Sequence, residues 1–273
     1  MMPVEKHLRI TTLNVKGLGW VEKRSQLKKL ASKDHFICLQ ETRAQASKEI
    51  LWKKQLGFDS AVWANANSAC KGSAVLGRDP NTWYFNDNLG RVAASTTEIK
   101  IDSDLISLTV ISVYAPNHRT TIASRKEYLD VIRTVREILN ERSSSQGKKE
   151  FIIAGDLNLP FGYLDIEEGR PLPAPDLVNE WVELFQDFNL EDSFRLLYPT
   201  VRSPTFIPQG TNPNGIFRRL DYVFMSQGLT PYIKEVKHEI VGFTDHKRVS
   251  VKLDWSSERG PGFWKANMLN LEH

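Results

Sequence analysis

The stretch Phe151-Ile152-Ile153-Ala154-Gly155-Asp156-Leu157-Asn158 joins a short apolar run to a polar turn signal. Such a run, closed by Gly, Asp and Asn, is typical of a buried β-strand that ends in a turn. In extended backbone Asp156 and Asn158 fall on the same side, so a carboxylate that accepts a proton and an amide that donates a hydrogen bond could face one atom. An Asx turn is the commoner explanation of an isolated Asp-x-Asn, and this motif alone leaves both open.

Seven further segments share the short length and the apolar, often β-branched, composition of this strand. They span residues 8–14, 36–40, 73–77, 92–99, 105–114, 220–225 and 249–253. The run at 151–154 is apolar throughout whereas 107–110 alternates, so both fully buried and half-exposed strands are expected. Two packed sheets would satisfy both kinds.

Three stretches repeat apolar residues with the helical period: 22–32, 124–142 and 176–188. Asp176 follows Pro175 and is predicted to cap the third helix. We find no repeat and no long Pro/Gly linker within the body of the chain, so one domain is expected over residues 1–255. Residues 256–273 are interpreted as a linker or tail toward a missing downstream region, and the final Leu-Glu-His resembles a cloning scar with a tag remnant.

The composition is that of a globular protein, with 41% hydrophobic and 25% charged residues. The 36 Lys and Arg against 33 Asp and Glu permit a polyanionic partner, but fall short of a strongly basic nucleic-acid binder. Cys38 and Cys70 do not form a disulfide framework, so a reducing intracellular compartment is expected. With no apolar run of ~18 residues and no signal-like leader, we expect neither a membrane span nor secretion.

Polar residues also stand at the ends of other predicted strands. Asn14 closes the first strand and Glu41 follows the second. A carboxylate that follows three apolar strand residues must be exposed or bind something, because burying an unpaired charge costs several kcal/mol. Glu41 is therefore a candidate metal ligand, although a Glu in such a place is most often a solvated surface group.

Three more motifs complete the set: Val-Tyr-Ala-Pro-Asn at 113–117, Arg-Arg-Leu-Asp-Tyr at 218–222 and Gly-Phe-Thr-Asp-His at 242–246. An Asp-His pair could hold a metal, relay a proton or place an imidazolium against phosphate, whereas a lone loop His is usually solvated. Each motif is weak alone. Turns and solvated side chains do not explain why all of them follow in this order at strand ends.

Together these motifs resemble the endonuclease/exonuclease/phosphatase superfamily, which includes exonuclease III-like abasic-site endonucleases, deoxyribonuclease I and the endonuclease domains of LINE-type (non-LTR) retrotransposons. The resemblance runs from about Leu8 to Leu253. It implies a four-layer α/β sandwich like that of deoxyribonuclease I, with two mixed β-sheets packed face to face, helices outside, and an active site at one sheet edge.

The resemblance also implies a role for each motif residue. Glu41 would be the main metal ligand, with Asn14 and Asp245 beside it, and the metal would be Mg²⁺, with Mn²⁺ as a substitute. Catalysis would use Asp156 as the base that activates water, Asn158 and Tyr114 as hydrogen-bond donors to the scissile phosphate, His246 near its non-bridging oxygen, and Asp221 to orient His246. The expected contacts with double-stranded DNA are Asn117, Thr205, Arg218, Arg219 and Thr244.

Three features favour the retrotransposon branch. Lys16 stands where abasic-site endonucleases typically have an acidic residue, and the segment after Asn158 lacks their Gly-Phe-Thr and Glu-Arg motifs. The tail at 260–267 resembles the segment that precedes the reverse transcriptase in LINE-type polyproteins. We therefore expect a nuclear, target-nicking endonuclease that leaves a 3′-hydroxyl to prime reverse transcription. Its partner would be the downstream reverse transcriptase, and the isolated domain would be monomeric.

Three alternatives stay open. The first is a cellular abasic-site endonuclease of DNA repair. The second is a superfamily phosphatase, which the compact length and the basic pairs disfavour, and the third is a DNA-binding relic without activity.

A protruding hairpin is predicted between Thr205 and Arg219, because Asn214-Gly215 is a strong two-residue turn signal. Its base would lie beside the catalytic cleft, so the hairpin would touch DNA next to the cut.

Overall fold

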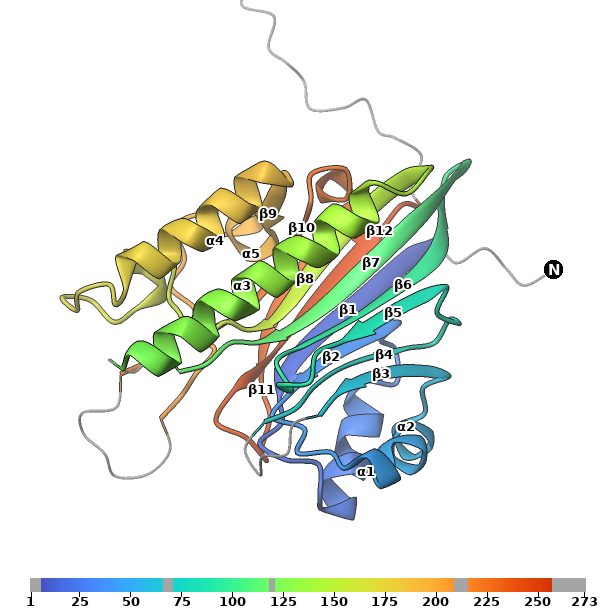
Figure 1. The fold of residues 1–273 in the computed structure, drawn as a ribbon, viewed down its shortest axis with the longest axis horizontal. Helices are drawn as coiled ribbons and strands as arrows, with labels where there is room; N and C mark the ends of the chain where they lie inside the picture. The colour runs from blue at the N-terminus through green and yellow to red at the C-terminus, as the bar shows by residue number, and fades with distance from the viewer. Residues whose placement is uncertain (1–5, 66–70, 118–120, 209–215, 257–273) are drawn as a thin grey trace, which may run out of the picture.

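The computed structural model describes residues 6–65, 71–117, 121–208 and 216–256. In this part of the chain two six-stranded β-sheets pack face to face, and helices cover their outer faces (Figure 1). The expected four-layer α/β sandwich is confirmed.

The first sheet has the strand order β11-β12-β1-β2-β4-β3. Its strands are β1 (His7–Asn14), β2 (Phe36–Gln40), β3 (Ser60–Ala64), β4 (Ser73–Gly77), β11 (Ile233–Ile240) and β12 (Lys247–Asp254). β1 and β2 are parallel, and the other described pairs are antiparallel. Between β1 and β2 the chain forms α1 (Val21–Leu30), and α2 (Glu49–Leu56) follows a 3₁₀ turn at Ala46–Lys48.

The second sheet has the strand order β5-β6-β7-β8-β10-β9. Its strands are β5 (Trp83–Asn86), β6 (Val92–Ile101), β7 (Asp104–Tyr114), β8 (Lys148–Asp156), β9 (Leu190–Asp192) and β10 (Asp221–Ser226). β7 and β8 are parallel and are joined by α3 (Ile122–Ser143), the usual way to connect parallel neighbours. The remaining elements are 3₁₀ turns at Tyr163–Asp165 and Thr230–Tyr232, α4 (Pro175–Asp187) and α5 (Ser193–Leu197).

The alternation of side chains along each strand explains the layers. On β8, Ile152 and Ala154 enter the core between the two sheets, whereas Phe151 and Ile153 enter the core under α3 and α4. A third core lies between the first sheet and α1 and α2. A strand buried on both faces needs apolar residues at every position, which is why 151–154 shows no alternation.

All eight predicted strands and all three predicted helices are present, with ends that differ by a few residues. The predictions omitted β3, β5, β9, β11, α2 and α5. The predicted N-cap was wrong: α4 begins at Pro175, and Ala174 occupies the cap position. Proline suits the first helical position because its fixed φ is already helical and its missing N–H has no partner there.

None of the described helices is long and apolar enough to cross a membrane. Cys38 is a buried free thiol, whereas Cys70 lies outside the described residues. The tip of the predicted hairpin, at 209–215, and the tail at 257–273 also lie outside them.

Candidate active site

The strand ends that carry the polar motifs meet at one edge of the sandwich. Asn14 ends β1 and pairs in register with Gln40, the residue before Glu41. In the second sheet Asp156 lies in register with both Tyr114 on β7 and Asp221 on β10. The parallel pairs put the carboxyl ends of neighbouring strands side by side, so the predicted residues converge.

Asn14 joins the two sheets at the centre of this edge. Its side-chain Nδ2 donates to Glu41 Oε1 at 3.1 Å and to Asp156 Oδ2 at 2.9 Å. The Tyr114 hydroxyl donates to the same Glu41 oxygen at 3.2 Å. Burial and the charge of Glu41 raise the pKa of Tyr114 well above its usual value, so it stays a neutral donor.

His246 is held between two aspartates. Its Nδ1 lies 2.9 and 3.1 Å from the two carboxylate oxygens of Asp221, and its Nε2 lies 3.8 Å from Asp156 Oδ2. Burial alone would lower the pKa of His246, but the charges of Asp221 and Asp156 and the hydrogen bond to Asp221 raise it to about 10. The ring is therefore an imidazolium at neutral pH, with Nε2 directed toward the site.

Asp156 is almost fully buried. Burial raises its pKa to about 7, against the opposing influence of His246 and the hydrogen bond from Asn14. A carboxyl group that titrates near neutral pH can both accept and return a proton under physiological conditions. The backbone N–H of Asn158 donates to Asp156 Oδ1 at 3.0 Å, so the Asx turn is present as well and holds the carboxylate in place.

The predicted metal ligands fit a divalent cation. Asp245 Oδ1 is buried without a hydrogen-bond partner among the described residues, and Asp245 Oδ2 lies 2.5 Å from Lys16 Nζ. Glu41 Oε2 accepts from Arg43 at 3.1 Å. Two carboxylates that rely on flexible, partly exposed cations for neutralisation match the oxygen-ligand chemistry of Mg²⁺ or Mn²⁺.

Asp156, Asp221 and His246 form a second group of potential ligands, whose donor atoms lie within 4.8 Å of one another. The contact between Asp221 and His246 already occupies one ring nitrogen and both oxygens of Asp221. The only ligand atoms of this trio that are left for a metal ion are His246 Nε2 and the Asp156 carboxylate. Its geometry therefore suits proton transfer and phosphate binding better than metal binding.

Backbone strain is concentrated around the site. Lys16, Glu41, Arg43 and Asn158 all adopt φ values between 48° and 51°, a left-handed conformation that is uncommon for residues other than Gly and costs of order 1–3 kcal/mol each. Gly155, next to Asp156, has a different reason to be Gly. A Cβ there would lie 1.9 Å from the Val113 carbonyl oxygen, so only Gly lets β8 approach β7.

The predicted DNA contacts divide into two groups. Asn117 is exposed and Arg218 half-buried, so both stay predictions. The prediction for Arg219 was wrong: its guanidinium is 1% exposed and forms ion pairs with Asp165 at 2.7 Å and Asp192 at 2.6 Å. It supports the fold from within and has no surface to offer a phosphate.

The two threonines of the predicted DNA contacts are also buried, and their hydroxyls serve the protein's own backbone. Thr205 Oγ1 accepts from the N–H groups of Leu220 and Asp221 at 2.9 and 3.0 Å, which fixes the start of β10. Thr244 Oγ1 donates to the Asn14 carbonyl oxygen at 2.8 Å and fastens the Asp245 loop to β1. Both hydroxyls are thus engaged by the backbone around the site, and direct DNA contacts by these two threonines stay predictions.

Sequence reasoning missed Arg43 as a site residue and used Lys16 only to choose between branches. Extended-strand spacing could not have revealed the pairing of Arg43 with Glu41, because both residues lie beyond the end of β2 in left-handed backbone conformations. Phe206, whose ring centroid lies 5.3 Å from that of His246, was also missed. It pairs with His246 through an isolated β-bridge that the sequence does not reveal.

Comparison with known proteins agrees with this geometry. Residues 11–246 match the profile of the endonuclease/exonuclease/phosphatase family. No curated protein sequence matches the chain significantly.

Two solved structures are similar over 91% of this chain. The AP endonuclease LMAP from Leishmania major is 21% identical, with a TM-score of 0.73 over 88% of its own chain. The 3′ phosphatase NExo from Neisseria, bound to a product DNA hairpin, is 19% identical, with a TM-score of 0.72 over 100% of its own chain. At these identities the likeness shows a common fold.

The family match spans all the strand-end motifs, and the fold brings Asp156, His246 and the carboxylates of Glu41 and Asp245 to one edge of the sandwich. The chain therefore belongs to the endonuclease/exonuclease/phosphatase family and carries the site of a nuclease/phosphatase-type hydrolase.

Proposed function

We propose that the chain is an Mg²⁺-dependent endonuclease that nicks double-stranded DNA and leaves a 3′-hydroxyl. The observation that carries the proposal is the pairing of Asp156, whose pKa is about 7, with the His246 imidazolium 3.8 Å away, beside the carboxylates of Glu41 and Asp245. A base, a cationic hydrogen-bond donor and a metal site are the components needed to hydrolyse a phosphodiester.

In this mechanism Asp156 takes a proton from water as the water oxygen bonds to phosphorus. The P–O3′ bond breaks, and the departing oxygen takes up a proton to become the 3′-hydroxyl. His246 Nε2 donates to a non-bridging oxygen as negative charge develops on it, and Tyr114 donates as a neutral phenol. A metal ion held by Glu41, Asn14 and Asp245 would neutralise phosphate charge.

The surroundings of the site favour a polymeric substrate. Lys16 and Arg43 lie at the rim, 42% and 43% exposed, and both open onto a large cavity. A cationic rim that extends away from the reacting centre suits a chain with many phosphates, since neutralising phosphates dominates the affinity for nucleic acids.

We further propose that the domain nicks the target of a LINE-type retrotransposon in the nucleus, and that a downstream reverse transcriptase extends the new end. Lys16 and the sequence at 260–267 support this origin. Because Lys16 bridges to Asp245, the site differs in charge from one with an acidic residue in that position.

A cellular abasic-site endonuclease is the second candidate, favoured by the likeness to the Leishmania AP endonuclease. A phosphatase is the third, favoured by the likeness to NExo. Both remain compatible with the same catalytic set.

One assay separates the candidates. Supercoiled plasmid, an abasic duplex with its intact match, and a soluble phosphomonoester are each incubated with the protein and Mg²⁺, beside an Asp156→Asn control. We expect the plasmid to be nicked, its 3′ ends to be extended by a polymerase, and the intact and abasic duplexes to be cut at similar rates. Abasic cleavage faster by about 10³-fold, a difference of about 4 kcal/mol in barrier, would establish the repair function instead. Turnover of the phosphomonoester alone would establish a phosphatase.

A further inference from the structure

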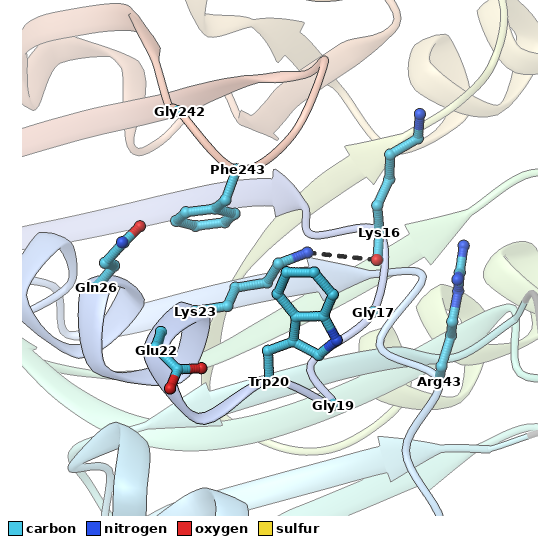
Figure 2. Close-up of a pocket in the computed structure, with 10 residues that line it drawn as sticks. All are labelled: Lys16, Gly17, Gly19, Trp20, Glu22, Lys23, Gln26, Arg43, Gly242 and Phe243. Atoms are coloured by element: carbon cyan, nitrogen blue, oxygen red, sulfur yellow. Dashed lines mark hydrogen bonds between the residues drawn. The ribbon is translucent and has the colours of Figure 1, made fainter.

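A cavity of about 880 Å³ adjoins the metal-binding carboxylates (Figure 2). It lies between the start of α1 and the loop before β12. Two of its lining residues, Lys16 and Arg43, contact Asp245 and Glu41, and a third, Phe243, stands two residues before Asp245. The cavity is therefore an extension of the active site, and a substrate bound at the metal would reach into it.

The charge of the lining is mainly positive. Lys16, Lys23 and Arg43 line the cavity against a single carboxylate, that of Glu22. Lys23 Nζ is held in place by the carbonyl oxygens of Val15 at 2.8 Å and Lys16 at 3.4 Å (Figure 2). Burial and the nearby charges of Arg43 and Lys16 lower the pKa of Lys23. The three cations gathered around the cavity would stabilise an added anion.

The cavity also has aromatic walls. Trp20 is 77% exposed, whereas Trp52, Trp63, Trp181 and Trp255 are at most 8% exposed. Phe243 stands opposite Trp20 in Figure 2, with Lys23 Nζ 5.4 Å from its ring centroid. Gln26, at one end of the cavity, offers both a donor and an acceptor. A large indole surface left in water, next to cations and an amide, is the combination that binds a nucleobase and its phosphate.

We propose that this cavity is a subsite for one unstacked nucleotide of the cut strand, with the base against Trp20 and the phosphate toward Lys16, Lys23 and Arg43. The inference rests on the proposed endonuclease function. The volume lies in the range of small-molecule sites, which is large enough for one nucleotide.

The subsite has a consequence for where the enzyme cuts. A paired base must leave the helix to reach Trp20, which costs a few kcal/mol, whereas stacking on an aromatic ring returns about 1–3 kcal/mol. A nucleotide that is already unpaired needs no free energy to leave the helix and still gains the stacking free energy on Trp20. The protein should therefore prefer phosphodiesters that adjoin a bulged or single-stranded nucleotide, on the side that faces the cavity.

Binding is tested first, with the Asp156→Asn protein so that the DNA stays intact. The probes are duplexes that carry one bulged 2-aminopurine at successive positions around a fixed nick site. Stacking on an indole quenches 2-aminopurine, so quenching should peak at one position. Trp20→Ala should abolish the peak and Trp20→Phe should keep part of it. The matched control is Tyr84→Ala, which removes a 69% exposed aromatic on β5 outside the cavity and should leave the peak unchanged.

Cleavage is tested on the same duplexes with active protein. We expect kcat/KM to be about tenfold higher with the bulge at the quenched position than with full pairing, and Trp20→Ala to lose this preference. Tyr84→Ala, outside the cavity, should keep the wild-type rates on both paired and bulged duplexes. Equal preference in wild type and Trp20→Ala, or quenching that survives in Trp20→Ala, would overturn the subsite while plasmid nicking still supported the endonuclease. A protein that neither binds nor nicks DNA would overturn both.

Discussion

At the scale of single residues, the site works by setting two neighbouring groups to unlike protonation states. Asp156 is pushed toward the neutral acid by burial, whereas His246 is held as a cation by Asp221. The two share one site because each compensates the other: the imidazolium lowers the cost of the buried carboxylate, and the carboxylates lower that of the imidazolium.

Asp156→Asn is expected to lower nicking at least ~10²-fold, the contribution of a positioned base. Because the raised pKa of Asp156 means that its carboxylate is lost as pH falls through about 7, the wild-type rate should also fall with acidification. A bound cation would stabilise the carboxylate form of Asp156 and would therefore shift the fall in rate to lower pH. Rates of plasmid relaxation from pH 5 to 8 measure both effects. Wild-type activity in the Asn variant would remove Asp156 from the mechanism.

Arg219 gives the opposite prediction, because it supports the fold and has no surface for substrate. Arg219→Met removes the buried partner of Asp192 and leaves Asp165 with Arg195 alone, and breaking a buried pair costs about 3–5 kcal/mol. Urea unfolding should show this loss, whereas the DNA affinity of the folded protein should stay close to that of wild type. A stable variant with weakened DNA binding would restore the phosphate contact first predicted for this residue.

At the scale of elements, the closeness of β7 and β8 sets the position of the base. Asp156 is the last residue of β8, and Gly155 before it has no room for a Cβ against Val113. A distortion of this strand pair would be transmitted directly to the catalytic carboxylate.

Gly155→Ala is therefore expected to reduce nicking by ~10²-fold, since a displaced base loses its contribution. It should also lower stability by at least ~1 kcal/mol, the lower end for overpacking a buried site. Melting temperature and nicking rate measure the two losses. Gly147→Ala is a useful comparison, because it has open space around it but a φ of 92°, so it should cost stability without affecting the rate of the folded protein.

The segment of the predicted hairpin leads into β10 and hence to Asp221, and its two arms pair through a bridge between Phe206 and Arg218. We expect replacement of 207–217 by a short Gly-Ser turn to change the distribution of nicks on a plasmid, because base contacts and groove shape decide sequence preference whereas the metal decides chemistry. Metal dependence should persist. An unchanged nick map at comparable activity would place site selection elsewhere, such as the loop after Asn158.

The elements that the sequence predicted share one property, which is a continuous apolar or periodic pattern with a turn signal at its end. β11 lacks this pattern because it is an edge strand with mostly half-exposed or exposed residues, and α5 is too short to show a helical period. The strand-end residues of the site could be predicted because their positions follow from the strands. The burial of Arg219 could not be predicted from the sequence, because it depends on ion pairs with Asp165 and Asp192, which are distant in sequence.

At the scale of the whole molecule, the site spans the two sheets and is backed by polar contacts between them. Gln40 Nε2 on β2 donates to Ser112 Oγ on β7 at 3.1 Å, and Ser73 Oγ on β4 donates to the same oxygen at 2.8 Å. Below these contacts the interface is apolar. These contacts tie the two sheets together at the edge that carries Glu41 on the first sheet and Asp156 on the second.

Activity should depend on Mg²⁺ or Mn²⁺ and vanish with a chelator. Glu41, Asp245 and the substrate phosphate are all negatively charged, and a divalent cation between them would neutralise their repulsion. Saturating Mg²⁺ should also raise the melting temperature: a ligand at 100 times its Kd adds about 2.7 kcal/mol. For a protein of this size that corresponds to about 5 °C or more. Glu41→Gln should lose most of this shift. Full nicking in excess EDTA would contradict the metal assignment.

The order of the strands determines when the enzyme becomes active during its synthesis. Asn14 and Glu41 emerge early, the second sheet follows, and Asp245 and His246 come only with β12, which pairs with β1 to complete the first sheet. A nascent chain that still lacks β12 has Asn14, Glu41 and Asp156 but neither Asp245 nor His246 in place, and its first sheet is open. The complete site can therefore form only after residues up to about Asp254 have left the ribosome, because β12 must pair with β1 to hold Asp245 and His246 beside Asn14 and Glu41.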